Sequence, residues 1–185
     1  MLEFISAFSY GWLVILGAFI LVGWLARGFA ARTESKKMQY AGLALYVIAE
    51  AIIFLPILYI AAYYSSPDIL PNAAIVTGML FVGLTWVAFT TRKDFSFLRG
   101  ILSVGGFVAL GLIIASVLFG FTLGLVFSVV MVVMACIAIL YDTSKIIHDF
   151  HSDQYVAAAL ELFASVALLF WYILRIFMSR DYLLK

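Results

Sequence analysis

The sequence predicts an all-α, polytopic integral membrane bundle, and two observations lead to this class. Hydrophobic residues make up 66% of the 185 residues and charged residues 11%, and the mean hydropathy of +1.18 exceeds that of soluble proteins. The apolar residues also form long runs, and a helix needs about 20 of them to cross a bilayer. Such runs are too long for barrel strands. We therefore expect one transmembrane domain over residues 1–185, whose first partner is the lipid bilayer.

Six apolar runs, separated by short polar connections, define the expected helices. The connection at Phe119–Thr122 is so short that the fourth and fifth spans must be antiparallel neighbours. Pro56 falls inside the second span, where neighbouring helices can satisfy the freed carbonyl, so we expect a kink and not a break. The expected spans are about 9–31, 38–64, 72–91, 96–119, 121–147 and 154–178.

Basic residues orient the spans. They are concentrated in the first and third connections, and the second and fourth contain no Lys or Arg, so the positive-inside rule places both termini outside. Arg180 and Lys185 run against this pattern, and a re-entrant final segment is the alternative. The start lacks the basic region and cleavage site of a signal peptide. The orienting residues are Arg27, Arg32, Lys36, Lys37, Arg92, Lys93 and Arg99.

Charge and motifs argue against several functions. The chain has 11 Lys and Arg against 10 Asp and Glu, a balance that indicates no nucleic-acid partner. It contains no nucleotide-binding loop, nucleophile elbow or zinc-protease helix. We therefore predict a protein that is not an enzyme and has no resident cofactor.

Three acids in or near apolar spans are the leading candidates for function. A charge at the bilayer centre costs at least about 2.5–3.5 kcal/mol, so Glu50, Asp142 and Glu161 should face protein, a partner or water. Tyr46 lies one turn before Glu50 as a hydroxyl donor, and Glu161 shares a helix face with Ser165. If the three acids converge, they form a proton-sensitive or cation-binding site. The alternative is that they are interfacial or helix-packing groups.

Metal binding is expected to be weak. Carboxylate oxygens suit calcium, but Asp142 and Glu161 supply only part of its shell. The run His148–Asp153 contains ligand residue types, but its spacing matches no specific transition-metal pattern, and we expect a solvated loop. Arg175 is a further polar residue inside the last span.

Four segments carry a resemblance to a known family. They are Thr90–Leu98, Ile139–His148, Leu160–Val166 and the acidic position within Ala49–Ala51. Taken in order, they resemble the Bax inhibitor-1 family of small membrane proteins, and within it the bacterial YccA-like branch, over residues 10–178. Such relatives usually have seven spans behind a polar tail, so we expect either a missing first helix or a misassigned start.

The resemblance implies a bundle with a central last helix and a location in the bacterial inner membrane. It also implies a pH-sensitive calcium leak, closed by two facing aspartates. Asp142 matches the first of these, but Ser165 stands at the second, and we expect Glu161 to substitute for it. YccA-like relatives also lack the second aspartate, and they restrain the membrane AAA+ protease FtsH. Modulation of such a protease, without transport, is therefore the alternative function.

Overall fold

A computed structural model describes residues 17–18, 20–30 and 35–184, with side chains as far as Arg180. In these residues every regular element is a helix, and five helices are long and apolar enough to cross a membrane. The predicted all-α membrane class is confirmed. The expected first span, 9–31, lies partly outside the described residues, which include a shorter apolar helix at Ile20–Ala30. The long helices are α2 (Lys36–Tyr64), α3 (Ile69–Thr91), α4 (Leu98–Phe119), α5 (Leu125–His148) and α6 (Tyr155–Leu184).

The helix boundaries differ from the expected ones where local backbone chemistry intervenes. α3 begins at Ile69 instead of residue 72, because Pro71 fits within a first turn, where its missing N–H is not needed. α4 ends where Gly120 takes a left-handed conformation, with φ of 71°. The next four residues are not helical, so α5 begins at Leu125. α2 continues through Pro56 without a break.

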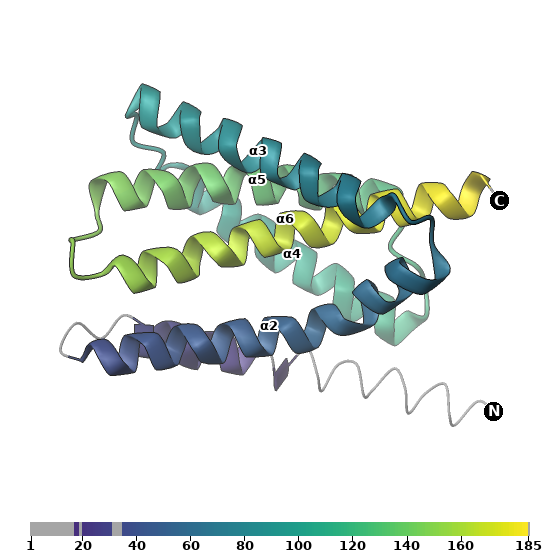
Figure 1. The fold of residues 1–185 in the computed structure, drawn as a ribbon, viewed down its shortest axis with the longest axis horizontal. Helices are drawn as coiled ribbons and strands as arrows, with labels where there is room; N and C mark the ends of the chain where they lie inside the picture. The colour runs from purple at the N-terminus through teal and green to yellow at the C-terminus, as the bar shows by residue number, and fades with distance from the viewer. Residues whose placement is uncertain (1–16, 19, 31–34, 185) are drawn as a thin grey trace.

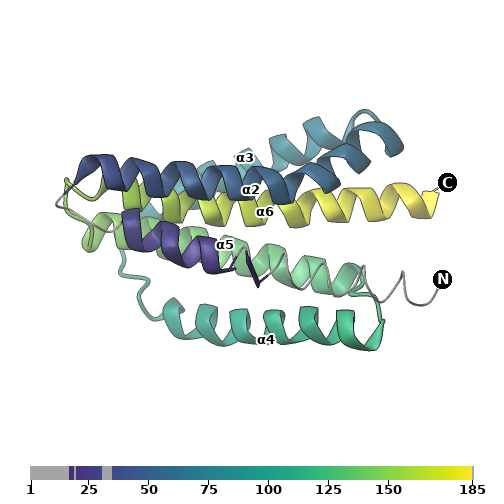
Figure 2. The same cartoon turned by 90° about the horizontal axis from the view of Figure 1, so that it is seen from below.

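α6 is the central helix of the bundle (Figures 1 and 2). It packs against α2, α3 and α5, and half of its membrane-spanning stretch is buried within the protein. This central position agrees with the expected arrangement. α4 is the least buried of the long helices. It packs on α5 alone among them, and only 6% of its span is buried. Figure 2 shows α4 along one edge of the bundle.

Small residues bring the helices close together. A Cβ added at Gly42 would lie 2.6 Å from the carbonyl oxygen of Ala26 and 2.9 Å from the amide nitrogen of Ala30. The segment Ile20–Ala30 therefore contacts the backbone of α2, an approach that only glycine permits.

The main core is formed by Ala61, Ile69, Ala73, Ala135, Ile139, Leu169, Ile173, Leu174 and Met178.

The connections lie at two opposite ends of the bundle (Figure 1). One end holds the start of α2 and the connections 92–97 and 149–154, and we call it the basic end. There, Gln39 donates a hydrogen bond to the Asp153 carbonyl, and the Ser144 hydroxyl accepts one from the Phe95 amide in the connection 92–97. The far end holds the connections 65–68 and 120–124. The described residues with basic side chains at the basic end are Arg27, Lys36, Lys37, Arg92, Lys93, Arg99 and Lys145.

Candidate functional site

A buried pair, Asp142 and Ser165, joins α5 to α6. Asp142 lies two turns before the end of α5, and Ser165 faces it from the antiparallel α6. The Ser165 hydroxyl donates a hydrogen bond to Asp142 Oδ2. The two residues are only 9% and 8% exposed. The structure thus brings together two of the predicted site residues, with a hydroxyl as the direct partner of the acid.

Lys145 and Glu161 form a second contact, one turn nearer the basic end. The Lys145 ammonium donates to both carboxylate oxygens of Glu161, at 2.9 Å each. It also lies 5.2 Å from the ring centroid of Phe150. Glu161 faces the interior, as expected from its helix face, but its partner is Lys145. The structure therefore does not place Glu161 as a substitute for an acid at Ser165, because Ser165 itself contacts Asp142.

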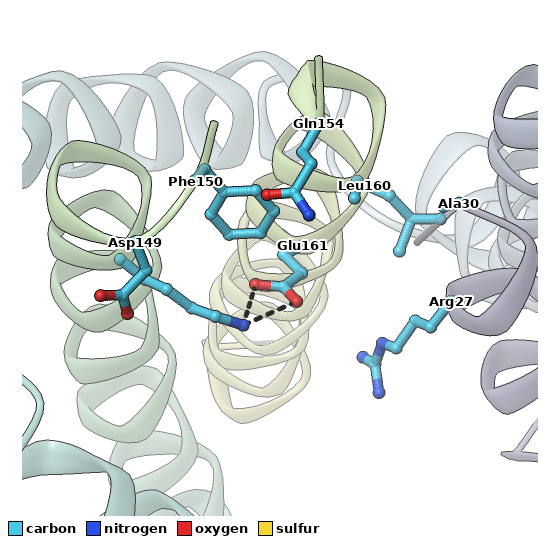
Figure 3. A pocket seen from close by; sticks show the side chains of 9 residues that line it. Arg27, Ala30, Asp149, Phe150, Gln154, Leu160 and Glu161 are labelled. Atoms are coloured by element: carbon cyan, nitrogen blue, oxygen red, sulfur yellow. Dashed lines mark hydrogen bonds and ion pairs between the residues drawn. The ribbon is translucent and has the colours of Figure 1, made fainter. Parts of the chain in front are cut away.

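A cavity of about 250 Å³ opens beside this ion pair at the basic end. It lies between the α5–α6 turn, the first turns of α6 and the segment Ile20–Ala30. Figure 3 shows the Arg27 guanidinium on the opposite side of the cavity from Glu161. The cavity reaches the Lys145–Glu161 pair but not Asp142. Its lining residues are Arg27, Ala30, Lys145, Asp149, Phe150, Gln154, Ala157, Leu160 and Glu161.

Glu50 lies apart from the other two acids. It belongs to the buried face of α2, one turn after Tyr46, and is 9% exposed. Its Oε2 has no hydrogen-bond partner among the described residues. The structure brings Glu50 into contact with neither Asp142 nor Glu161, so the three acids do not form one cluster.

Arg175 contributes to the far end of the bundle. Its Nη2 donates a hydrogen bond to the Leu123 carbonyl at 2.7 Å. This bond ties α6 to the connection between α4 and α5. Arg175 therefore has a structural contact of its own, nearly three turns of α6 beyond Ser165.

The sequence interpretation missed two residues that follow Asp142. The Ser144 hydroxyl accepts a hydrogen bond from the Phe95 amide at 3.0 Å and donates one to the Lys93 carbonyl at 3.3 Å. It thereby ties the connection between α3 and α4 to α5. Lys145 was the second omission, although its position three residues after Asp142 already placed both on the same side of a helix.

The described side chains form no cluster suited to a bound metal. No group of three or more His, Cys, Asp and Glu residues occurs in this part of the chain. A calcium ion at Asp142 and Glu161 would compete with the ammonium of Lys145. His148, one of the candidate ligands in the run 148–153, is within hydrogen-bond distance of the backbone instead, with its Nδ1 2.8 Å from the Ser144 carbonyl oxygen.

These features define a multi-pass integral membrane protein built around its last helix, with a buried polar contact at the centre. Residues 1–181 match the family described as "Inhibitor of apoptosis-promoting Bax1". The chain belongs to this family, the Bax inhibitor-1 family.

Individual relatives match over parts of the chain, which spans about half of their length. A protein of Pseudomonas aeruginosa is 38% identical over 111 residues, or 60% of this chain and 50% of the relative. The modulator of FtsH protease YccA from Escherichia coli K12 is 35% identical over 117 residues, or 62% and 53%. A Golgi anti-apoptotic protein of vaccinia virus, strain Lister, is 32% identical over 110 residues, or 57% and 45%.

The names of these relatives bear on the class and location of the chain. The same Escherichia coli match is also described as an inner membrane protein, and a Vibrio cholerae relative as a membrane protein. Together with the five long apolar helices, this is consistent with a multi-pass protein of the bacterial inner membrane. The Escherichia coli K12 relative is named as a modulator of a protease, and the vaccinia virus relative as an anti-apoptotic protein.

Proposed function

We propose that the protein is a pH-sensitive leak for calcium or a similar cation, closed by the contact between Asp142 and Ser165. The observation that carries this proposal is the position of a buried carboxyl group at the interface of the central helix. An ionised carboxylate can only accept hydrogen bonds, whereas a protonated one can also donate. A change of protonation at Asp142 therefore changes the contact that holds α5 against α6. Oxygen ligands also suit calcium.

The charges nearer the basic end would regulate how a cation approaches this contact. Arg27 and Lys145 line the cavity through which a cation would approach from that end. Glu161 offsets the positive charge of Lys145 by pairing with it. Opening the pair would give a passing cation a free carboxylate, but it would also expose an unpaired ammonium. The ion pair is thus a second point at which charge regulates entry.

Calcium flux into liposomes that contain only the purified protein tests this function. Wild-type flux should change with pH between about 5 and 8, the range in which a perturbed carboxyl group titrates. Asp142→Asn keeps the side-chain size and should alter both the flux and its pH dependence. Asp153→Asn is the matched control, because Asp153 is an exposed acid at the same end. Flux that is equal in wild type and Asp142→Asn at every pH would contradict a carboxyl gate.

Modulation of a membrane AAA+ protease is the second candidate function, and a different observation favours it. The Escherichia coli relative is named as a modulator of FtsH protease. In this chain α4 offers a surface for a partner helix, since it packs only on α5 among the long helices. A Cβ at Gly100, Gly106 or Gly111 would meet nothing within 4 Å. Such small residues allow close approach of another transmembrane helix.

Co-purification with an AAA+ membrane protease tests this alternative. We expect association, and slower degradation of the protease's membrane substrates when the protein is overproduced. Gly106→Leu should weaken both effects, whereas Gly83→Leu, at an equally open position on α3, should not. Asp142→Asn should leave association intact, because the acid is buried away from the lipid-facing surface. Absence of both association and slowed degradation would exclude this function.

A further inference from the structure

A second and larger cavity lies between α2, α4 and α6. Its volume is about 510 Å³, within the range of 300–1,000 Å³ typical of small-molecule sites. α2 and α4 do not contact each other, and Figure 2 shows them on opposite sides of the bundle. The walls are mainly apolar and aromatic, and include Ile53, Phe54, Ile113 and Trp171. The cavity is therefore an apolar chamber, separate from the Asp142 site.

Glu50 makes one wall of this chamber chemically distinctive. Its side chain lines the cavity, and the residue is 91% buried. Its Oε2 has no hydrogen-bond partner among the described residues. The Tyr46 hydroxyl, one turn earlier, hydrogen-bonds the same carboxyl group, but Oε2 itself has lost water without gaining a partner, which is costly. A ligand that supplies a positive charge would remove this cost.

The aromatic side chains around Glu50 favour the same kind of ligand. Phe54 and Trp171 meet edge to face, with ring centroids 5.1 Å apart and planes at 79°, and Tyr172 lines the same cavity. Aromatic faces attract organic cations, most strongly where water is excluded. Arg175 lines the cavity beside the connection 120–124, where its Nη2 donates a hydrogen bond to the Leu123 carbonyl. Because the guanidinium keeps its positive charge, we expect the cationic group of a ligand to lie on the Glu50 side of the cavity.

We infer that this cavity binds an amphipathic organic cation, that is, a protonated amine or quaternary ammonium group on an apolar body. The cationic group pairs with Glu50 and lies against the aromatic rings. The apolar body fills the remainder of the chamber along α4 and α6. A bare inorganic cation would leave these apolar walls uncovered, and an anionic amphiphile would be repelled by Glu50. This inference concerns a different cavity from the proposed leak and stands without it.

Tryptophan fluorescence quenching tests the site directly. The protein carries Trp12→Phe, Trp24→Phe and Trp86→Phe, which leaves Trp171 in the cavity wall, and is placed in vesicles of zwitterionic lipid. The probe is 4-bromobenzyltrimethylammonium, whose bromine quenches indole fluorescence on contact. We expect saturable quenching, with the neutral analogue 4-bromoneopentylbenzene about tenfold weaker or more, since it lacks the charge that pairs with Glu50.

Two cavity variants and one control complete the design. Glu50→Gln should weaken probe binding about tenfold, because it removes the charge and keeps the size. Val117→Phe fills part of the cavity from the loosely packed α4 without adding a second tryptophan, and it should abolish saturable binding without altering Glu50. Asp153→Asn, which changes an exposed acid outside this cavity, should bind the probe as the parent does. Equal quenching by the two probes, or binding that Glu50→Gln leaves unchanged, would overturn the inference. Unsaturable quenching in every variant would also overturn it, as it would indicate only partition into lipid.

Discussion

Lys145 on α5 donates two hydrogen bonds to Glu161 on α6, one helical turn from the contact between Asp142 and Ser165. The antiparallel helices are thus joined by two successive polar contacts, one buried and one half-buried. The buried contact leaves Asp142 with a neutral partner. The half-buried contact pairs Glu161, the nearest other acid, with Lys145. Asp142 is therefore the acid that no basic side chain pairs with directly at this interface.

The Lys145–Glu161 pair should show energetic coupling. Lys145→Gln or Glu161→Gln alone leaves one charge unpaired, so the double variant should lose less stability than the sum of the two. We expect a coupling energy of about 1 kcal/mol, the upper part of the range for accessible pairs, because each side chain is only about 30% exposed. Unfolding in mixed micelles measures it. Lys93→Gln, an exposed control, should show no coupling to Glu161→Gln. Additive losses from the pair itself would contradict this prediction.

Glu161 should influence proton sensitivity through Lys145. Glu161→Gln leaves the ammonium of Lys145 unpaired one turn from Asp142, which favours the ionised carboxylate. We therefore expect Glu161→Gln to weaken the pH response of calcium flux, and the double change with Asp142→Asn to add little, since both act on one interface. A Glu161→Gln variant with the wild-type response, beside an Asp142→Asn variant that has lost it, would show that Asp142 works alone.

Ser165→Asp should tighten closure at neutral pH. The substitution places a second carboxyl group against Asp142, and two such groups share a proton because both cannot ionise cheaply at short range. A shared proton gives a stronger hydrogen bond than the serine hydroxyl provides. Calcium flux in liposomes at pH 7 should fall. It should recover when the pH is raised enough to remove the shared proton or lowered enough to protonate both carboxyl groups. Ser165→Asn, of the same size but without an ionisable group, is the control. Equal flux in the two variants would contradict the prediction.

Gly42→Ala should destabilise the bundle. A Cβ at this position would overlap the backbone of Ala26 and Ala30, which cannot move as a flexible side chain could. We expect a loss of about 1–3 kcal/mol, the usual cost of overpacking. Gly83→Ala on α3 meets nothing within 4 Å and should be neutral or stabilising by up to about 1 kcal/mol. Thermal unfolding in detergent compares the two. Equal stability of the two variants would show that the close approach at Gly42 does not hold the bundle together.

The helices were predictable because each carries its own signal. Long apolar runs broken by polar connections indicate membrane helices whatever their neighbours are. The same reasoning predicts inward faces for Asp142 and Glu161, since charges avoid lipid, and for Ser165, because it shares a helix face with Glu161. Boundaries were harder to predict. The start of α3 depends on whether Pro71 lies before a helix or within its first turn, and both are allowed.

The partners of the acids were not predictable from the sequence. Periodicity shows which face of a helix a residue occupies, but not the axial register between two helices. That register decides that Ser165 meets Asp142 and that Lys145 meets Glu161. The separation of Glu50 from the other two acids depends on the same kind of information, because it arises from how α2 packs on α6. No local pattern reports how two separate helices are aligned along the bundle.

The orientation of the bundle gives the last prediction. The basic side chains gather at the end that holds the connections 92–97 and 149–154, and this end should be cytoplasmic under the positive-inside rule. Cys136 is the single cysteine, so Cys136→Ser provides a background for labelling. In intact cells an impermeant thiol reagent should react with cysteines placed at Asp68 and Arg180 but not at Asp94 or Asp153. Protection at Arg180 together with reaction at Asp68 would mean that α6 does not cross the membrane completely, and reaction at Asp153 would reverse the orientation.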